Sequence, residues 1–101
     1  MSEYRICKTI EFEGWLQTLT PKHRKQVEKR LAKIEEEGYF GEVRAIRMGI
    51  YELKWKIGTR AYYVYVALTD LLFLWGGNKN GQTQDIQKAA NVLERLRAKK
   101  S

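Results

Sequence analysis

The sequence predicts a single α+β domain spanning residues 1–101, with an N-terminal strand and an αα-hairpin packed on an antiparallel sheet of three or four strands, and a closing C-terminal helix. Three observations predict this fold class. Apolar residues recur at helical spacing near both ends of the chain. Between those segments they alternate or run continuously, as in strands. No repeat or linker-like stretch divides the chain. We expect the helices to cover one face of the sheet.

The first 40 residues predict one strand and two helices. Residues 4–8 alternate weakly and predict a short strand. A helix over about 11–19 follows from the spacing of its apolar residues, which are Phe12, Trp15, Leu16 and Leu19. Thr20 and Pro21 predict the start of a second helix, because Thr caps N-termini and Pro is tolerated at the first helical position. Gly38 predicts its end.

The second half predicts a meander of strands. Residues 43–47 form the first candidate, and residues 50–57 alternate clearly, with Tyr51, Leu53, Trp55 and Ile57 on one side. A hairpin turn at Gly58-Thr59 leads to a returning strand over 60–67, and a continuous apolar strand follows over 71–75. The closing helix is predicted after Thr83, a candidate N-cap, from its apolar stripe of Ile86, Ala89, Ala90, Leu93 and Leu96.

Charge and composition narrow the class of partner. The chain carries 19 Lys and Arg against 12 Asp and Glu, a formal charge of +7, which favours nucleic acid or another polyanion. A single cysteine excludes an intrachain disulfide and a thiolate zinc site. The sequence shows no leader pattern and no apolar run of the ~18 residues that span a bilayer. We therefore expect a cytoplasmic protein without a membrane partner.

Alternation in the 50–57 strand predicts a cationic sheet face. If the helices cover Tyr51 and Leu53, then Glu52, Lys54 and Lys56 lie on the opposite, exposed face. The hairpin brings Arg60 beside these lysines, and Tyr62 shares the side of Arg60, as an exposed aromatic residue. Bases stack on aromatic rings while Lys and Arg neutralise phosphates, so this face suits RNA. Another cation, Lys79, follows the glycine-rich end of the last strand.

Several kinds of chemistry are disfavoured by what the sequence lacks. His23 is the only histidine and sits at a helix start, so catalysis by a histidine pair is excluded. No carboxylate and histidine cluster has metal-ligand spacing, so we expect neither a metal nor another cofactor. The stretch from Gly76 to Lys79 lacks the Walker A pattern. Any RNA cleavage would use Lys and Arg, with the substrate 2′-OH attacking the adjacent phosphate and Arg stabilising the pentavalent oxygens.

Five motifs lie along nearly the whole chain. In order, they are Phe12-x-x-Trp15-Leu16-x-x-Leu19, Arg24 with Arg30-Leu31, Gly49-Ile50-Tyr51-Glu52-Leu53-Lys54, Arg60-Ala61-Tyr62-Tyr63, and Gly76-Gly77-Asn78-Lys79-x-x-Gln82-x-x-Asp85-Ile86. Together these motifs resemble those of the RelE/ParE superfamily of small bacterial toxins. The last motif, termed here the Gly-Gly box, is similar to the box of the HigB-like branch, also called addiction module killer proteins. The resemblance implies a RelE-like fold.

The resemblance also implies a function and site residues. It implies the toxin of a type II toxin–antitoxin system, held inactive by a cognate antitoxin that is often a helix-turn-helix protein. Most characterised relatives cut mRNA in the ribosomal A site without metal and leave a 2′,3′-cyclic phosphate. By position, Lys54 binds phosphate or acts as base, Arg60 clamps the transition state and Lys79 positions the backbone or assists the leaving group. The RNA-binding candidates are Lys56, Tyr62, Asn78 and Gln82, of which Lys56 is inferred from the sheet face alone and not from the resemblance.

Three functions remain open at this stage. The first is a metal-independent, ribosome-dependent mRNA endoribonuclease that inhibits translation. The second is a non-nucleolytic inhibitor of DNA gyrase, as in the ParE branch of the same fold. The third is an inactive module that binds RNA or the antitoxin. The chain departs from the family pattern because Lys54 replaces the commoner Arg, Asn78 replaces Asp, and no C-terminal Tyr or His matches the known catalytic sets. The identity of the general base is therefore open.

Overall fold

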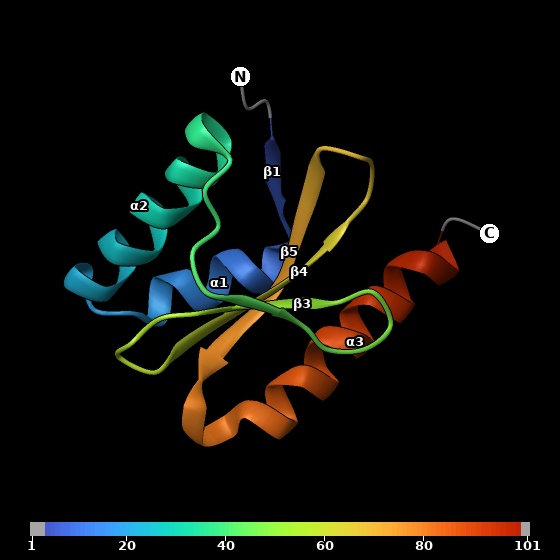
Figure 1. Ribbon diagram of the computed structural model, residues 1–101. Coiled ribbons are helices and arrows are strands. Elements are labelled where there is room, and N and C mark those ends of the chain that lie inside the picture. The colour runs from blue at the N-terminus through green and yellow to red at the C-terminus, as the bar shows by residue number, and fades with distance from the viewer. Residues whose placement is uncertain (1–3, 100–101) are drawn as a thin grey trace.

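The computed structural model describes residues 4–99 and contains three helices and five strands within that range. Figure 1 shows their arrangement. In chain order they are β1 (Arg5–Lys8), α1 (Ile10–Thr18), α2 (Pro21–Glu37), β2 (Val43–Ala45), β3 (Tyr51–Lys54), β4 (Thr59–Tyr65), β5 (Asp70–Asn78), a 3₁₀ turn (Lys79–Gly81) and α3 (Gln82–Lys99). The α+β class and the order of elements are as predicted.

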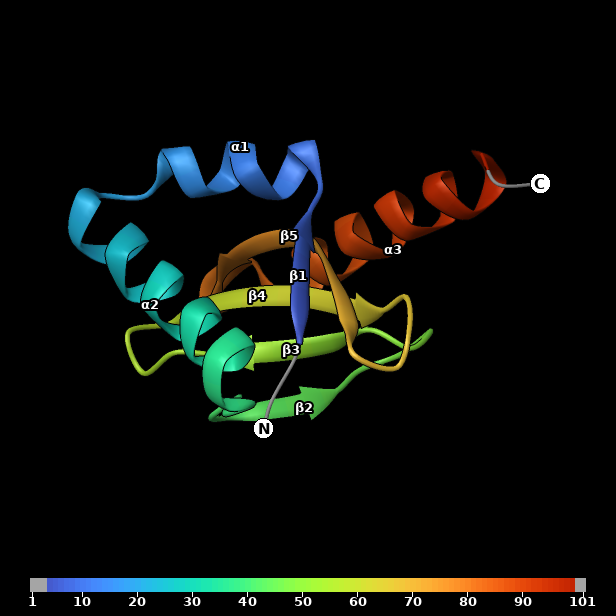
Figure 2. The ribbon, with the colours of Figure 1, turned by 90° about the horizontal axis from the view of Figure 1, so that it is seen from above.

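All five strands form one sheet in the order β1-β5-β4-β3-β2. The four strands β2 to β5 pair antiparallel, which confirms the predicted meander. The N-terminal strand joins the same sheet as a fifth strand, parallel to β5, with Arg5 opposite Asp70. Figure 2 looks onto a face of this sheet, with α2 in front of the meander.

The expectation that the helices share one face of the sheet is wrong. One core cluster joins α1 and α2 to one face through residues such as Phe12, Leu31 and Tyr63, whereas α3 covers the other face and buries Tyr62 and Leu74. Figure 1 shows α2 and α3 on opposite sides of the sheet. The physical reason lies in β4 and β5, whose side chains are apolar on both faces and therefore need a cover on both.

An irregularity between β4 and β5 sets which side chains face which helix. Tyr62 lies opposite Trp75, but its neighbour Tyr63 lies opposite Phe73, so Leu74 is an extra residue in β5. Leu74 and Trp75 consequently both pack in the α3 cluster. Beyond this bulge, successive residues of β5 face the two helical layers in turn again.

The predicted helix boundaries hold for α2 but not for α3. Thr20 caps α2 by accepting a hydrogen bond from the His23 N–H at 3.2 Å, and Gly38 ends it at a φ of 68°. Thr83 is not an N-cap, because α3 already begins at Gln82, directly after the 3₁₀ turn. The cap at this junction is Asn78, whose side chain accepts from two backbone N–H groups of that turn.

No helix within residues 4–99 is both long and apolar enough to cross a lipid bilayer.

Candidate functional site

Four predicted site residues meet at one end of the sheet, where β3 ends, β4 begins and β5 ends. We call Lys54, Lys56, Arg60 and Lys79 the cationic corner. Lys54 and Arg60 lie directly opposite each other on β3 and β4, so their Cβ atoms are about 5 Å apart and on the same face. On its other side Arg60 faces Gly77, which has no side chain. The strand register therefore brings two cations together at this end of the sheet.

The Arg60 side chain is mostly buried, and few of its N–H groups have hydrogen-bond partners. Only 11% of its side chain is exposed. Its Nη1 donates one long hydrogen bond, 3.3 Å, to the Thr59 carbonyl, and its Nε is buried without any hydrogen-bond partner among the described residues. A guanidinium has five N–H donors, and buried donors are nearly always paired. Arg60 thus has unused donors of the kind that bind the oxygens of a phosphate.

Glu52 lies next to Arg60, although the alternation in the sequence predicted an exposed position for it. Glu52 is 0% exposed, and its Oε2 lies 3.8 Å from Arg60 Nε. Its Oε1 accepts a hydrogen bond from Arg44 Nε and its Oε2 accepts one from Gln82 Nε2, both at 2.8 Å. Burial alone would raise the pKa of Glu52, but these hydrogen bonds more than offset it, so the pKa lies below its usual value.

Sequence reasoning assigned Glu52 no role, because alternation grouped it with two exposed lysines. The available signal was the continuous apolar run of β5, which predicts cover on both sheet faces and so a buried place for Glu52. Three side chains lie in register across neighbouring strands of that face, with Arg44 opposite Glu52 and Glu52 opposite Tyr62. A buried carboxylate in such a row needs cations beside it.

The two lysines of β3 and its following turn face a hollow of about 460 Å³ on one side of the corner. Lys54 is 31% exposed, and its Nζ lies 3.3 Å from the Glu42 carboxylate, which is itself mostly exposed. Such an exposed ion pair contributes little stability and separates easily. The hollow is lined by Gln26, Lys29, Arg30, Tyr39, Gly41, Glu42, Lys54, Trp55, Lys56 and Ile57. Its cations outnumber its single carboxylate.

Arg30, named only as part of a helix motif in the sequence, connects α2 to the corner. Its guanidinium donates to the carbonyls of Phe40 at 2.8 Å and Glu42 at 2.6 Å, and also to the Lys54 carbonyl. The same group stacks over the Trp55 ring at 4.5 Å from its centroid. With its donors committed to the backbone, Arg30 positions the end of β3 and is not free to bind a ligand.

Lys79 lies against the β3–β4 turn but does not line that hollow. Its backbone N–H donates to the Gly58 carbonyl at 2.8 Å, and its methylene chain lies 3.4 Å from where a Cβ of Gly58 would be. No described carboxylate forms an ion pair with Lys79. Its side chain lines a second hollow of about 620 Å³ together with His23. Lys79 therefore presents an unpaired ammonium group next to the turn.

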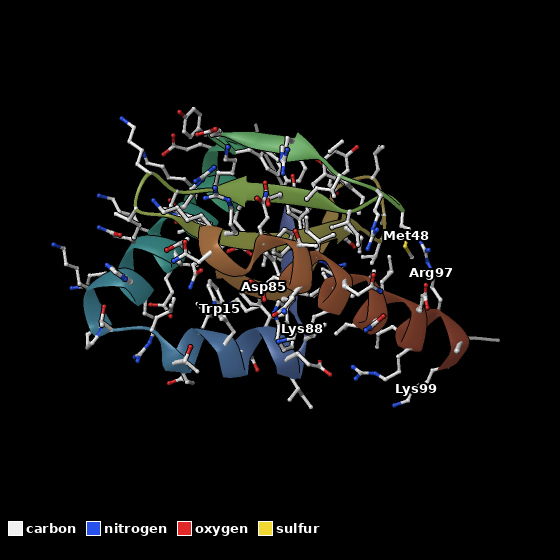
Figure 3. All side chains as sticks on the ribbon, turned by 90° about the horizontal axis from the view of Figure 1, so that it is seen from below. Trp15, Met48, Asp85, Lys88, Arg97 and Lys99 are labelled. Atoms are coloured by element: carbon white, nitrogen blue, oxygen red, sulfur yellow. The ribbon has the colours of Figure 1, made fainter. Side chains whose placement is uncertain are left out.

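The glycines of the Gly-Gly box allow side chains from α1 and α3 to pack closely against the end of β5. A Cβ on Gly76 would fall 2.2 Å from the Trp15 ring, and one on Gly77 would fall 1.9 Å from Asp85 Oδ2. Asp85 is held there because its Oδ1 accepts from Trp75 Nε1 at 3.1 Å. Figure 3 shows Trp15 and Asp85 near each other between α1 and α3. Within the box, Lys79 is left with its charged group free.

Three of the predicted RNA-binding residues are engaged elsewhere. Tyr62 was expected to be exposed, which is wrong, because α3 covers it completely and its ring has no surface for a base to stack on. Burial, and then the charge of Glu52, raise the pKa of its hydroxyl well above the usual value. The side-chain oxygen of Asn78 caps the 3₁₀ turn, and the amide of Gln82 donates to Glu52. Lys56 is exposed on the β3–β4 turn.

Within residues 4–99, no group of three or more His, Cys, Asp and Glu side chains is arranged to hold a metal ion.

Comparison with solved structures identifies the architecture. A mutant of Escherichia coli toxin RelE in the free state superimposes with a TM-score of 0.69 at 16% identity, over 88% of this chain and 96% of RelE. The chain has the fold of the RelE toxins. RelE in the intact E. coli RelBE toxin–antitoxin complex gives a TM-score of 0.63 at 18% identity, over 74% of this chain and 95% of that one. The Mycobacterium tuberculosis RelBE2 toxin–antitoxin complex gives 0.64 at 17%, over 77% and 93%.

Sequence comparison finds a relative, but it assigns the chain to no family and no function. An uncharacterized protein of Haemophilus influenzae is 29% identical over 96 residues, which cover 91% of this chain and 95% of that protein. No protein-family model matches the sequence. The RelE fold of this chain thus rests on the structural likeness, and the arrangement of the cationic corner is the basis for assigning a function.

Proposed function

We propose that this chain is the toxin of a type II toxin–antitoxin system and inhibits translation by cutting mRNA on the ribosome. The observation that carries the proposal is the state of Arg60, a mostly buried guanidinium with unused donors that lies directly opposite Lys54. Lys79, the first residue after β5, adds an unpaired ammonium group. This set of cations fits a phosphodiester, and the RelE fold supports the same conclusion.

The proposed reaction uses the RNA's own 2′-OH. That oxygen attacks the adjacent phosphorus, the bond from phosphorus to the 5′-oxygen breaks, and the products are a 2′,3′-cyclic phosphate and a 5′-hydroxyl. The unused donors of Arg60 bind the equatorial oxygens as their charge grows. Lys54 contacts the phosphate or accepts the 2′-OH proton, and Lys79 donates a proton to the leaving 5′-oxygen. Lys56, exposed on the adjacent turn, contacts the backbone of the RNA.

A cognate antitoxin is the second proposed partner. Two of the structural relatives are toxins described in complex with their antitoxins. The net charge of +7 favours an acidic partner segment, and such a segment would compete with RNA for the same cations.

The proposal is tested by inducing the chain in a bacterial host and mapping cuts in a translated reporter mRNA by primer extension. Growth arrest with cuts that need translation is the expected result, and both should disappear with Arg60→Ala and weaken with Lys79→Ala. Lys99→Ala is the matched control, because it removes one lysine from the far end of α3, which Figure 3 shows away from Asp85 and Trp15. Growth arrest with intact mRNA and inhibited DNA supercoiling would instead indicate a gyrase inhibitor.

A further inference from the structure

Glu52 is held rigidly from two sides of the sheet. Its two oxygens accept hydrogen bonds from different elements, Oε1 from Arg44 on β2 and Oε2 from Gln82 at the start of α3, each at 2.8 Å. The side chain is 0% exposed. A carboxylate fixed in this way has one position and one orientation, and its charge is little screened by solvent.

The relation of Glu52 to Arg60 is electrostatic and not a hydrogen bond. Oε2 lies 3.8 Å from Arg60 Nε, too far for a hydrogen bond but close enough for strong attraction between two mostly buried charges. The donors of Arg60 are therefore not used by Glu52. The carboxylate attracts the guanidinium toward the sheet, while Nε has no hydrogen-bond partner among the described residues and Nη1 donates only to the Thr59 carbonyl.

We propose that Glu52 is a positioning residue, which holds the Arg60 guanidinium at the floor of the cationic corner with its donors free for phosphate oxygens. This inference rests on the proposed function, in which Arg60 binds the reacting phosphate. Glu52 also competes with that phosphate for the positive charge of Arg60, because both are anions on the same cation. Fixed orientation raises the rate of cleavage, and the competition weakens ground-state binding.

These two effects predict a split that a purely structural residue would not show. Glu52→Gln has nearly the same shape and removes the charge, and Gln82 can reverse its amide to accept from the new side-chain N–H₂. Without the carboxylate, RNA binding should tighten about threefold or more, and cleavage at saturating toxin should slow by at least the same factor. Loss of fold alone would weaken both binding and cleavage.

The experiment is a double-mutant cycle between positions 52 and 60. The wild type, Glu52→Gln, Arg60→Ala and the double variant are compared by fluorescence anisotropy with a single-stranded, 2′-O-methylated oligonucleotide, which has no free 2′-OH. Each is also assayed for cleavage of mRNA in a reconstituted translation system at saturating and half-saturating toxin. Glu42→Gln is the matched control, since it removes the exposed carboxylate beside Lys54 at 3.3 Å.

The double-mutant cycle separates the contribution of Arg60 to RNA binding from the contributions of other cations. Glu52→Gln also frees Arg44, so part of any gain in binding can come from there. The proposal expects the gain in binding to shrink by half or more when Arg60 is Ala. An equal gain in both backgrounds, or a loss of binding with Glu52→Gln in the wild-type background, overturns it. If Arg60→Ala leaves oligonucleotide binding unchanged, the proposed function itself fails at that site.

A measurement on the wild type covers the case in which Glu52→Gln does not fold. The Nε–Hε resonance of Arg60 is expected to be resolved by NMR, because a buried and pinned guanidinium rotates slowly. Titration with the same oligonucleotide should shift this resonance, since phosphate replaces Glu52 as the nearest anion. A resonance that stays in place while RNA binds would show that Arg60 is not presented to phosphate, and this would overturn the proposal.

Discussion

Asp85 of α3 lies so close to Gly77 of β5 that a Cβ atom on Gly77 would fall 1.9 Å from its Oδ2. The preceding residue has the same property on the other face, where a Cβ on Gly76 would fall 2.2 Å from the ring of Trp15. The exit of β5 is thus closed from both helical layers. The glycines allow this packing, and the Asp85 carboxylate takes the place of a side chain at Gly77, the residue opposite Arg60.

We predict that Gly76→Ala destabilises the fold by about 2 kcal/mol or more, because the Trp15 ring must move within a packed core. Gly14→Ala is the matched control. Gly14 lies within α1 with no atom within 4 Å of its Cβ position, so this change should stabilise the protein by about 0.5–1 kcal/mol. Urea unfolding of both variants checks the prediction. Equal destabilisation by the two changes would contradict it.

Tyr62→Phe should be tolerated. The ring of Tyr62 is fully buried, and its hydroxyl lies near Glu52 without a hydrogen bond of normal geometry, so removing the hydroxyl should cost little. We expect a change in unfolding free energy within about 1 kcal/mol and no loss of oligonucleotide affinity. Thermal unfolding and anisotropy measure the two quantities. A loss of affinity without a loss of stability would mean that Tyr62 contacts RNA after all.

Glu52 should contribute to the acid sensitivity of the fold. Its folded-state pKa is lower than its usual value of 4.5, so the stability it provides is fully present above pH 4.5. This contribution is lost as pH falls through the lower, folded-state pKa. Between pH 6 and pH 3, the unfolding free energy should therefore fall less steeply in Glu52→Gln than in the wild type. An identical or steeper fall in the variant would contradict the prediction.

Arg30→Lys should destabilise the protein although it keeps the charge. The guanidinium donates to three backbone carbonyls and stacks on Trp55, and a lysine cannot satisfy those acceptors with the same geometry. We expect a loss of about 2 kcal/mol in urea unfolding. Lys29→Arg, one residue earlier on an exposed position, is the control and should change stability by less than about 0.5 kcal/mol.

The sequence was sufficient for the elements that local physics determines. Helical spacing and the Thr20 and Gly38 caps placed α2 within a residue of its ends, and alternation identified the meander. The side of the sheet taken by α3 was not accessible in the same way, because an amphipathic helix fits either face. The β5 bulge was equally hidden, since it depends on how two strands pair and not on one segment.

The sequence predicted which cations form the candidate site better than it predicted the residues that surround them. Lys54, Arg60 and Lys79 do lie at one end of the sheet, because strand register pairs Lys54 with Arg60 and the end of β5 brings Lys79 against the β3–β4 turn. Tyr62 and Glu52 were predicted to be exposed because α3 was expected on the opposite face of the sheet. Since α3 covers their face, both predictions of exposure are wrong. The hydrogen bond from Gln82 to Glu52 forms because Glu52 is buried under α3, and no pattern in the sequence predicts it.

The most direct test of the central claim uses 5′-labelled mRNA in a reconstituted translation system, with ribosomes either present or omitted. We expect the wild type to cut the mRNA only on ribosomes and to leave a 2′,3′-cyclic phosphate, and Arg60→Ala to lower the rate by a hundredfold or more, about the effect of losing one group that stabilises transition-state charge. Full-length mRNA after incubation with folded wild-type protein on ribosomes, or cutting that Arg60→Ala does not affect, would contradict the account.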